Sequence, residues 1–142
     1  MKYYSTNRNT PALSFREAVI KGLPEDNGLF MPEKIPTQSA EFLGNIPQKT
    51  LQEIGVEVAR PFVDNDLTSN ELQSVVKETL SFEIPIVNVQ DNICSLELFH
   101  GPTCAFKDVG ARFLARCLSH FSQEKVNVLV ATSGDTGSAV AS

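Results

Sequence analysis

The 142-residue sequence contains no tryptophan, only three cysteines and no surplus of basic residues. The number of cysteines is odd: they are Cys94, Cys104 and Cys117. Their spacing contains neither a Cys-x-x-Cys pair nor the Cys/His pattern of a metal site. We therefore expect reduced, packed thiols and no bound metal. The net charge of −5 and the pI near 5.0 give no basic surface for nucleic acid or an anionic membrane.

Long apolar runs are also missing. No run is long enough to cross a membrane as a helix, and residues 1–6 lack the apolar core of a signal peptide. The sequence has no internal repeat and no low-complexity tract. What remains is an ordinary composition, 42% hydrophobic and 20% charged, which suffices for one modest core. We expect a soluble, cytoplasmic protein.

The first half of the chain carries mainly helix signals. The Ser/Thr-x-x-Glu pattern of a capping box occurs at 14–17 and again at 68–71, and each predicts the start of a helix. A further helix is predicted over 49–60, where Pro61 should stop or kink it. Residues 33–48 contain two prolines and a glycine, so they are predicted to be mainly loop. A short strand is predicted over 3–6.

The second half begins with strand-like sequence. Residues 84–89 and 93–99 are rich in β-branched and apolar residues, and the polar residues 90–92 between them predict a tight turn. The two strands should therefore form a hairpin. This change of character divides the chain into a mostly helical region, 1–81, and a second domain, 82–142.

One lysine stands at the start of a predicted amphipathic helix. Lys107 follows a Gly-Pro-Thr break in which Thr103 is a candidate N-cap. The positive end of the helix dipole disfavours the ammonium form of Lys107, and a neutral amine is what Schiff-base chemistry requires. The alternative is a solvated lysine paired with Asp108. The predicted buried stripe of this helix comprises residues 106, 109, 113, 114, 117, 118 and 121.

A second stretch suits an anion. Residues 126–131 predict a buried strand, and the glycine-rich turn 132–138 after it leads into a helix start. Unpaired N–H groups at a helix start attract a phosphate or a carboxylate, and hydroxyls of this turn add donors. An ordinary βα turn explains the same residues equally well. The turn is neither a P-loop nor a dinucleotide-binding fingerprint.

Together the two stretches suggest one pocket. In open α/β sheets, ligands collect beyond the carboxyl ends of the strands, so Lys107 and the turn could face the same ligand. The chemistry they imply is a carbonyl compound held as an imine beside a carboxylated substrate. The helix begun by residues 138–142 is too short to be stable alone, so we expect the chain to be part of a longer polypeptide.

Three segments resemble the threonine synthase family. Residues 99–113, with the sequence FHGPTCAFKDVGARF, are similar to its pyridoxal-phosphate lysine segment. Residues 132–139, TSGDTGSA, resemble its substrate-facing loop. Residues 14–23 and 28–32 are similar to the opening of the family. The resemblance keeps the order of these segments and covers essentially the whole chain.

The resemblance implies a fold and a reaction. The fold is α/β of fold type II, tryptophan-synthase-β-like, with residues 1–81 as an N-terminal helical region and 82–142 as the start of a truncated three-layer catalytic domain. The reaction converts O-phospho-L-homoserine and water to L-threonine and phosphate, the last step of threonine biosynthesis, by a carbon–oxygen lyase that uses pyridoxal 5′-phosphate. The partners implied are this substrate and the remainder of the same polypeptide.

The resemblance also implies the site residues. Lys107 is the catalytic lysine that bonds to the cofactor, and Asp135 lies near the 3′ oxygen of the cofactor ring. The substrate carboxylate is implied to bind Ser133, Gly134, Asp135 and Thr136. No metal ligand is implied.

The sequence departs from the family in places. Cys104 stands where a larger aliphatic residue is usual, and residues 5–8 follow the family opening only loosely. The loop for the cofactor phosphate and the partner of the pyridine nitrogen have no counterpart in these 142 residues, so we expect these residues alone to hold cofactor weakly and to be inactive. The alternatives are another fold type II lyase, such as a threonine dehydratase-like protein, and a catalytically silent relative.

Overall fold

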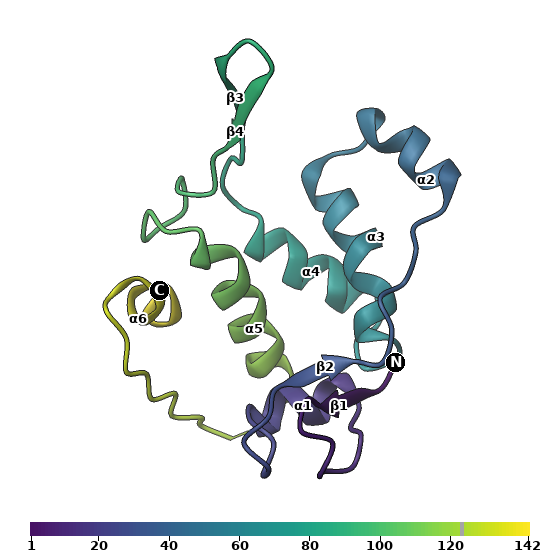
Figure 1. Cartoon of the computed structure of the whole chain (residues 1–142), viewed down its shortest axis with the longest axis vertical. Helices are drawn as coiled ribbons and strands as arrows, with labels where there is room; N and C mark the ends of the chain where they lie inside the picture. The colour runs from purple at the N-terminus through teal and green to yellow at the C-terminus, as the bar shows by residue number, and fades with distance from the viewer. Residues whose placement is uncertain (123) are drawn as a thin grey trace. The chain divides into compact units, whose positions relative to one another are not determined.

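The computed structural model describes residues 1–122 and 124–142, and it is a mixed α/β structure (Figure 1). The chain divides into two compact units, 1–76 and 77–142. No described helix is both long and apolar enough to cross a membrane. In chain order the elements are β1 (Tyr3–Ser5), α1 (Phe15–Lys21), β2 (Phe30–Pro32), α2 (Ala40–Asn45), the 3-10 helix η1 (Ile46–Gln48), α3 (Leu51–Val63), α4 (Ser69–Thr79), β3 (Ile86–Gln90), β4 (Ile93–Leu96), α5 (Lys107–Phe121) and α6 (Asp135–Ala141).

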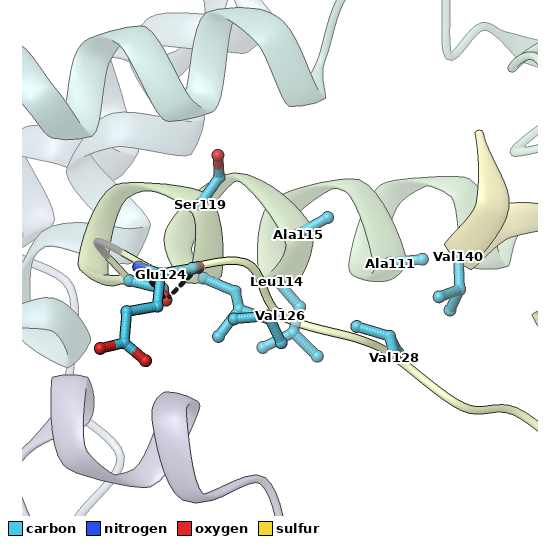
Figure 2. A pocket seen from close by; sticks show the side chains of 10 residues that line it. Ala111, Leu114, Ala115, Ser119, Glu124, Val126, Val128 and Val140 are labelled. Atoms are coloured by element: carbon cyan, nitrogen blue, oxygen red, sulfur yellow. Dashed lines mark hydrogen bonds between the residues drawn. The ribbon is translucent and has the colours of Figure 1, made fainter.

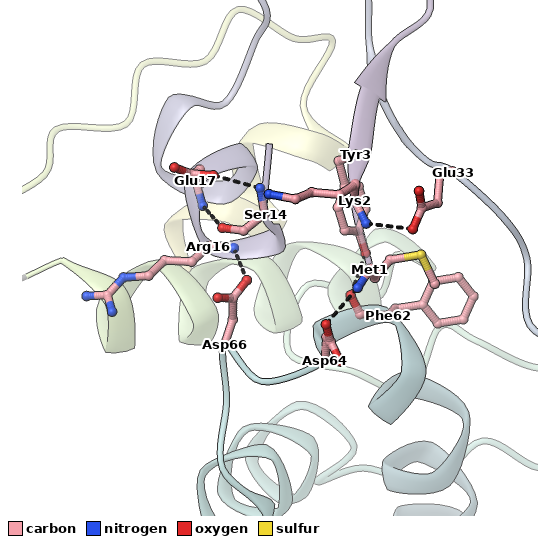
Figure 3. Close-up of polar contacts among 10 residues, drawn as sticks. All are labelled: Met1, Lys2, Tyr3, Ser14, Arg16, Glu17, Glu33, Phe62, Asp64 and Asp66. Atoms are coloured by element: carbon pink, nitrogen blue, oxygen red, sulfur yellow. Dashed lines mark hydrogen bonds and ion pairs between the residues drawn. The ribbon is translucent and has the colours of Figure 1, made fainter. Parts of the chain in front are cut away.

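The first unit contains a two-stranded antiparallel sheet. β1 pairs with β2, with Tyr3 opposite Pro32 and Ser5 opposite Phe30, which confirms the strand predicted over 3–6. The hydroxyl of Tyr3 donates a hydrogen bond to the carbonyl of Phe62 at 2.8 Å (Figure 3). Burial raises the pKa of the Tyr3 phenol to about 12, because the ionised form would lose its hydration. The sheet is thereby tied to the end of α3.

Asp26 closes the loop between α1 and β2. Its carboxylate accepts hydrogen bonds from the hydroxyl of the buried Ser5 at 2.5 Å and from the backbone amides of Asn9 and Gly28 at 2.9 and 3.0 Å. These donors lower the pKa of Asp26, the Ser5 hydroxyl most strongly. A Cβ at Gly28 would clash with the Oγ of Ser5, so a side chain there would displace the buried hydroxyl that bonds to Asp26.

Helix starts in the first unit follow local capping. The predicted boxes at Ser14 and Thr68 are both present, with Glu17 and Glu71 as the reciprocal acceptors. A further box at Thr50, which sequence analysis missed, starts α3 two residues later than predicted. α3 also continues through Pro61 to Val63, so the predicted end at residue 60 was wrong. Helical packing of the residues after Pro61 outweighs the loss of its N–H.

The prediction of a loop over 33–48 was wrong in its second part. Ser39 caps α2 by accepting a hydrogen bond from the amide of Phe42 at 3.0 Å, and Phe42 is only 8% exposed. Burial of this one aromatic side chain stabilises a short helix that has weak propensity of its own. The most deeply buried apolar side chains of the first unit are Val63, Leu67, Leu72, Val75 and Val76.

The second unit begins with the predicted hairpin. β3 and β4 pair antiparallel, with Ile86 opposite Leu96 and an irregularity between Asn88 and Gln90. The observed strands are shorter than the predicted 84–89 and 93–99 at their outer ends. Every side chain of β3 is exposed, and in β4 only Ser95 is partly covered.

α5 is anchored to the segment before the hairpin. A guanidinium N–H of Arg112 donates to the carbonyl of Glu78 at 2.7 Å and to the hydroxyl of Ser81 at 3.1 Å, and Arg116 forms a 2.8 Å ion pair with Glu78. The predicted buried stripe is only partly buried: Cys117 and Phe121 are 0% and 3% exposed, whereas residues 106 and 114 are 61% and 52% exposed. Periodicity identifies a shared face, but it does not say what covers that face.

The strand predicted over 126–131 is absent. This segment has no regular structure, and Leu129 is 94% exposed. In Figure 1 it runs as an unpaired trace between α5 and α6. A strand needs a neighbour to accept and donate its backbone hydrogen bonds, and no segment among the described residues pairs with it.

Candidate functional site

Lys107 is the first residue of α5. The predicted N-cap, Thr103, was wrong: the cap residue is Phe106, in helical backbone geometry and without a capping side-chain hydrogen bond. The Nζ of Lys107 lies 4.7 Å from the centre of the Phe106 ring. The lysine side chain is 34% exposed, so it is only partly covered by the described residues.

Asp108 does not pair with Lys107, contrary to the alternative considered from sequence. Its carboxylate is completely buried and accepts hydrogen bonds from the backbone amide and the hydroxyl of Thr103, at 3.0 and 2.5 Å. Gly101 packs against the same carboxylate, and a Cβ there would lie 2.4 Å from Oδ2. The Gly-Pro-Thr segment therefore folds around Asp108 and leaves Lys107 free to point elsewhere.

The carboxylate nearest to Lys107 belongs to Asp135, the first residue of α6. Its Oδ2 lies 4.0 Å from the Nζ of Lys107, and α5 packs against α6. The structure thus brings together two predicted site residues that are far apart in the sequence. Asp135 is 72% exposed, so water screens the pair and its contribution to stability is at most about 1 kcal/mol.

The turn before α6 is shaped by Thr132. Its hydroxyl oxygen accepts hydrogen bonds from the amides of Gly134 and Gly137 at 3.1 and 3.0 Å. Gly134 has φ +133°, which side-chain-bearing residues rarely adopt. The sequence motif alone indicated no separate role for Thr132, although a threonine two residues before a glycine is typical of such turns.

Of the remaining predicted residues, Ser133 and Gly134 lie on this turn and Thr136 is the second residue of α6. Ser133 and Gly134 are exposed, and Thr136 is partly exposed. None of the three has a hydrogen bond or ion pair with Lys107 in the described chain. Among those residues there is also no group of three His, Cys, Asp or Glu side chains placed to hold a metal ion.

A separate groove of about 330 Å³ runs along another face of α5 (Figure 2). It lies between that face, the segment 124–128 and Val140 of α6, and its walls are mainly apolar. Leu114 and Val128, which line it, are 52% and 54% exposed. No predicted site residue lines the groove, so it is distinct from the Lys107 site.

The sequence profile described as "Threonine synthase N terminus" matches residues 2–80, more than half of the chain. The chain belongs to the threonine synthase family. It is 37% identical over 142 residues to threonine synthase from Escherichia coli and 39% identical over 142 residues to that from Haemophilus influenzae. Each comparison covers 99% of this chain and 33% of the relative, so the chain spans about a third of the length of the threonine synthases it matches.

Solved threonine synthase structures agree with this family assignment. The crystal structure of the Escherichia coli protein superposes with a TM-score of 0.92 at 37% identity, covering 99% of this chain and 33% of that chain. A PLP-bound threonine synthase from Brucella melitensis gives a TM-score of 0.81 at 36% identity, covering 85% of this chain and 27% of that chain. At these identities the likeness extends from the fold to the family.

Proposed function

We propose that this chain forms part of a threonine synthase that uses pyridoxal 5′-phosphate to convert O-phospho-L-homoserine and water to L-threonine and phosphate. The observation that carries the proposal is the placement of the partly exposed Lys107, within the segment that resembles the family's lysine motif, 4.0 Å from Asp135 at the start of α6. The family membership and the PLP-bound relative support the same cofactor. The enzyme would be a lyase that acts on a phosphate ester, and we propose a cytoplasmic location.

The residues present fit this cofactor in part. A Schiff base with an aldehyde needs an approachable amine, and the side chain of Lys107 is 34% exposed. The turn beside it offers hydroxyls and the early amides of α6, which suit an anionic substrate group. No segment of these 142 residues matches a cradle for the cofactor phosphate. We therefore propose that residues 1–142 alone hold the cofactor weakly and turn over little substrate.

Lys107 is the catalytic residue of the proposal. When bound, the cofactor supplies an electron sink for charge that develops at the substrate Cα. Lys107 would hold the cofactor through its amine, and the same amine would move protons at Cα and at neighbouring carbons of the substrate. Over the whole reaction the Cγ–O bond to phosphate breaks, Cβ loses a proton while Cγ gains one, the hydroxyl of water adds at Cβ, and the remaining proton of water goes to phosphate. Atoms therefore balance between O-phosphohomoserine plus water and threonine plus phosphate.

The turn before α6 and the first two residues of that helix have a binding role in the proposal. Ser133, Gly134, Asp135 and Thr136 bind the substrate carboxylate, mainly through hydroxyl and backbone N–H donors. Asp135 is also the proposed neighbour of the cofactor ring oxygen. Thr132 holds this turn in shape through its two accepted hydrogen bonds, so it supports the binding residues without touching the substrate. For the whole chain we propose a helical region, 1–81, that precedes the start of a fold type II catalytic domain, 82–142.

The test uses the gene product at its natural length. With pyridoxal phosphate added, the proposal predicts a visible absorption band that is lost in Lys107→Ala, together with phosphate release from O-phosphohomoserine. A band without phosphate release would favour a different fold type II lyase, such as a threonine dehydratase-like enzyme. The absence of a lysine-dependent band would contradict both enzyme functions and leave a catalytically silent relative.

A further inference from the structure

Asp108 is a fully buried carboxylate directly next to Lys107 in the chain. A buried charge is costly unless hydrogen-bond donors face it. Both donors here come from Thr103, through its backbone amide at 3.0 Å and its hydroxyl at 2.5 Å. The charge of Asp108 is therefore satisfied by the loop that leads into α5, and neither donor belongs to α5 itself.

The loop is closely fitted around this carboxylate. Gly101 leaves no room for a side chain beside Oδ2, and its carbonyl accepts a hydrogen bond from the amide of Cys104 at 3.1 Å. The amide of Asp108 in turn donates to the carbonyl of Ala105 at 3.1 Å. Cys104 has φ +55°, where a bulkier β-branched residue would be strained. The start of α5 is thus held from within the loop, in place of a capping side chain at Phe106.

This arrangement sets the direction of Lys107. Successive residues of a helix point roughly 100° apart, because a turn contains about 3.6 residues. With Asp108 held inward, the Cα–Cβ bond of Lys107 points about 100° away from the buried carboxylate around the helix axis. The other contacts of Lys107 are weak by comparison, since Asp135 is 4.0 Å away and 72% exposed, and the Phe106 residue is 61% exposed.

We propose that Asp108 is a positioning residue that aims the Lys107 amine through its hydrogen bonds to Thr103. It does not touch the amine. The benefit of a fixed amine position rests on the proposed function, since a covalent bond to the cofactor requires the amine at one defined place. The aim itself is a property of the loop and exists without cofactor.

Four variants and one control separate this role from general stability. Asp108→Ala removes the acceptor, and Thr103→Val removes the hydroxyl donor while it keeps the carboxylate. Asp108→Asn keeps the shape and bonds the same two Thr103 groups, since its amide accepts from the N–H and donates to the hydroxyl oxygen. Thr103→Ser keeps both donors. Asp91→Asn, in the exposed hairpin turn, is the matched control.

Two readouts are taken on folded protein, checked by circular dichroism. The first needs no cofactor: the rate of acetylation of Lys107 is measured by peptide mass spectrometry relative to the exposed Lys34 in the same chain. The second is the yield of borohydride-trapped pyridoxyl group on Lys107 in the gene product at its natural length. In both Thr103→Val and Asp108→Ala, the acetylation rate of Lys107 should move several-fold toward that of Lys34. The yield of trapped pyridoxyl group on Lys107 should fall about tenfold or more, as expected for one lost hydrogen bond to a charged group.

The outcomes divide cleanly. Near-wild-type behaviour of Asp108→Asn, Thr103→Ser and Asp91→Asn, with both readouts changed in the other two variants, supports the positioning role. Unchanged acetylation and trapping in folded Asp108→Ala and Thr103→Val overturn it. If Asp108→Ala does not fold, Thr103→Val decides. If the wild type traps no cofactor but the acetylation rates shift as stated, the proposed function fails and the positioning role stands.

Discussion

Lys107 and Asp108 are neighbours in the chain with opposite environments. The lysine amine is accessible and faces Asp135 at 4.0 Å, whereas the aspartate is completely buried against Thr103. Sequence patterns placed both residues in the first turn of a helix, and they offered an ion pair between the two as one interpretation. The structure assigns them separate tasks, because a buried carboxylate bonded to Thr103 is turned away from the amine.

The cysteines give a direct test of burial at the residue scale. Cys117 is 0% exposed, and burial raises the pKa of its thiol to about 12, so it stays protonated and shielded near neutral pH. Cys94 and Cys104 are exposed. A thiol-reactive dye at pH 8 should therefore label Cys94 and Cys104 in the native protein and Cys117 only in denaturant. Fast native labelling of Cys117 would show that α5 does not bury this face.

Asp26 gives a test of pH dependence. Its pKa is lowered below its ordinary value in the folded state, chiefly by the hydrogen bond from the Ser5 hydroxyl. A lowered pKa stabilises the fold above the unfolded-state pKa, and this stabilisation is lost as the pH falls through the folded-state value. Urea unfolding of Asp26→Asn should thus show a stability deficit that is constant from neutral pH down to about pH 5 and shrinks below about pH 4. The exposed Asp91→Asn is the control, and a deficit independent of pH would contradict this account.

At the scale of elements, the sequence predicted best what is decided locally. Each capping box spans only four residues, 14–17 and 68–71, so the local pattern suffices to locate the starts of α1 and α4. The hairpin was predicted for the same reason. The helix α2 was missed because it depends on burial of Phe42, and the extension of α3 past Pro61 depends on packing that no local pattern encodes.

The cap of α3 can be tested by one substitution. The Thr50 hydroxyl accepts a hydrogen bond from the amide of Glu53 at 3.2 Å, and the Glu53 carboxylate accepts one from the amide of Thr50 at 2.7 Å. Thr50→Ala should lower the free energy of unfolding by about 1 kcal/mol, measured by urea denaturation. Thr50→Ser should restore most of it, and Thr37→Ala, in an exposed loop, should have little effect. Equal effects of Thr37→Ala and Thr50→Ala would argue against the cap.

The segment 126–131 can be tested by proteolysis. Lys125 is exposed and lies in irregular backbone, whereas Arg112 and Arg116 lie within α5 and bind Glu78. Limited trypsin digestion of residues 1–142 should therefore cut after Lys125 before it cuts after Arg112 or Arg116. Cleavage sites are read by mass spectrometry. Protection at Lys125 would show instead that the segment pairs as the predicted strand.

At the scale of the whole molecule, sequence and structure contribute different parts of the account. The family was identifiable from the motif around Lys107, and the profile match and the relatives confirm it. The approach of Lys107 to Asp135 was expected only from a general rule about α/β sheets, and the sheet of that rule is not formed here. Contacts across more than 25 residues depend on packing, which a single sequence does not specify.

The chain spans about a third of the relatives' length, so the threonine synthase activity is proposed for a polypeptide of the relatives' length. Several apolar side chains of this chain are exposed on β3, on α5 and along 126–131. Exposed apolar groups of this kind mark surfaces that other protein segments commonly cover. The proposed division between residues 81 and 82 stays a prediction, and the structure divides into compact units at 1–76 and 77–142.

The central claim is that Lys107 bonds covalently to pyridoxal phosphate. The most direct measurement treats the gene product at its natural length with the cofactor, reduces it with borohydride, and maps the pyridoxyl group by peptide mass spectrometry. The account predicts a single major modified lysine at position 107 and loss of that label in Lys107→Ala. A label spread over exposed lysines such as Lys34 and Lys125, with none enriched at Lys107, would contradict it.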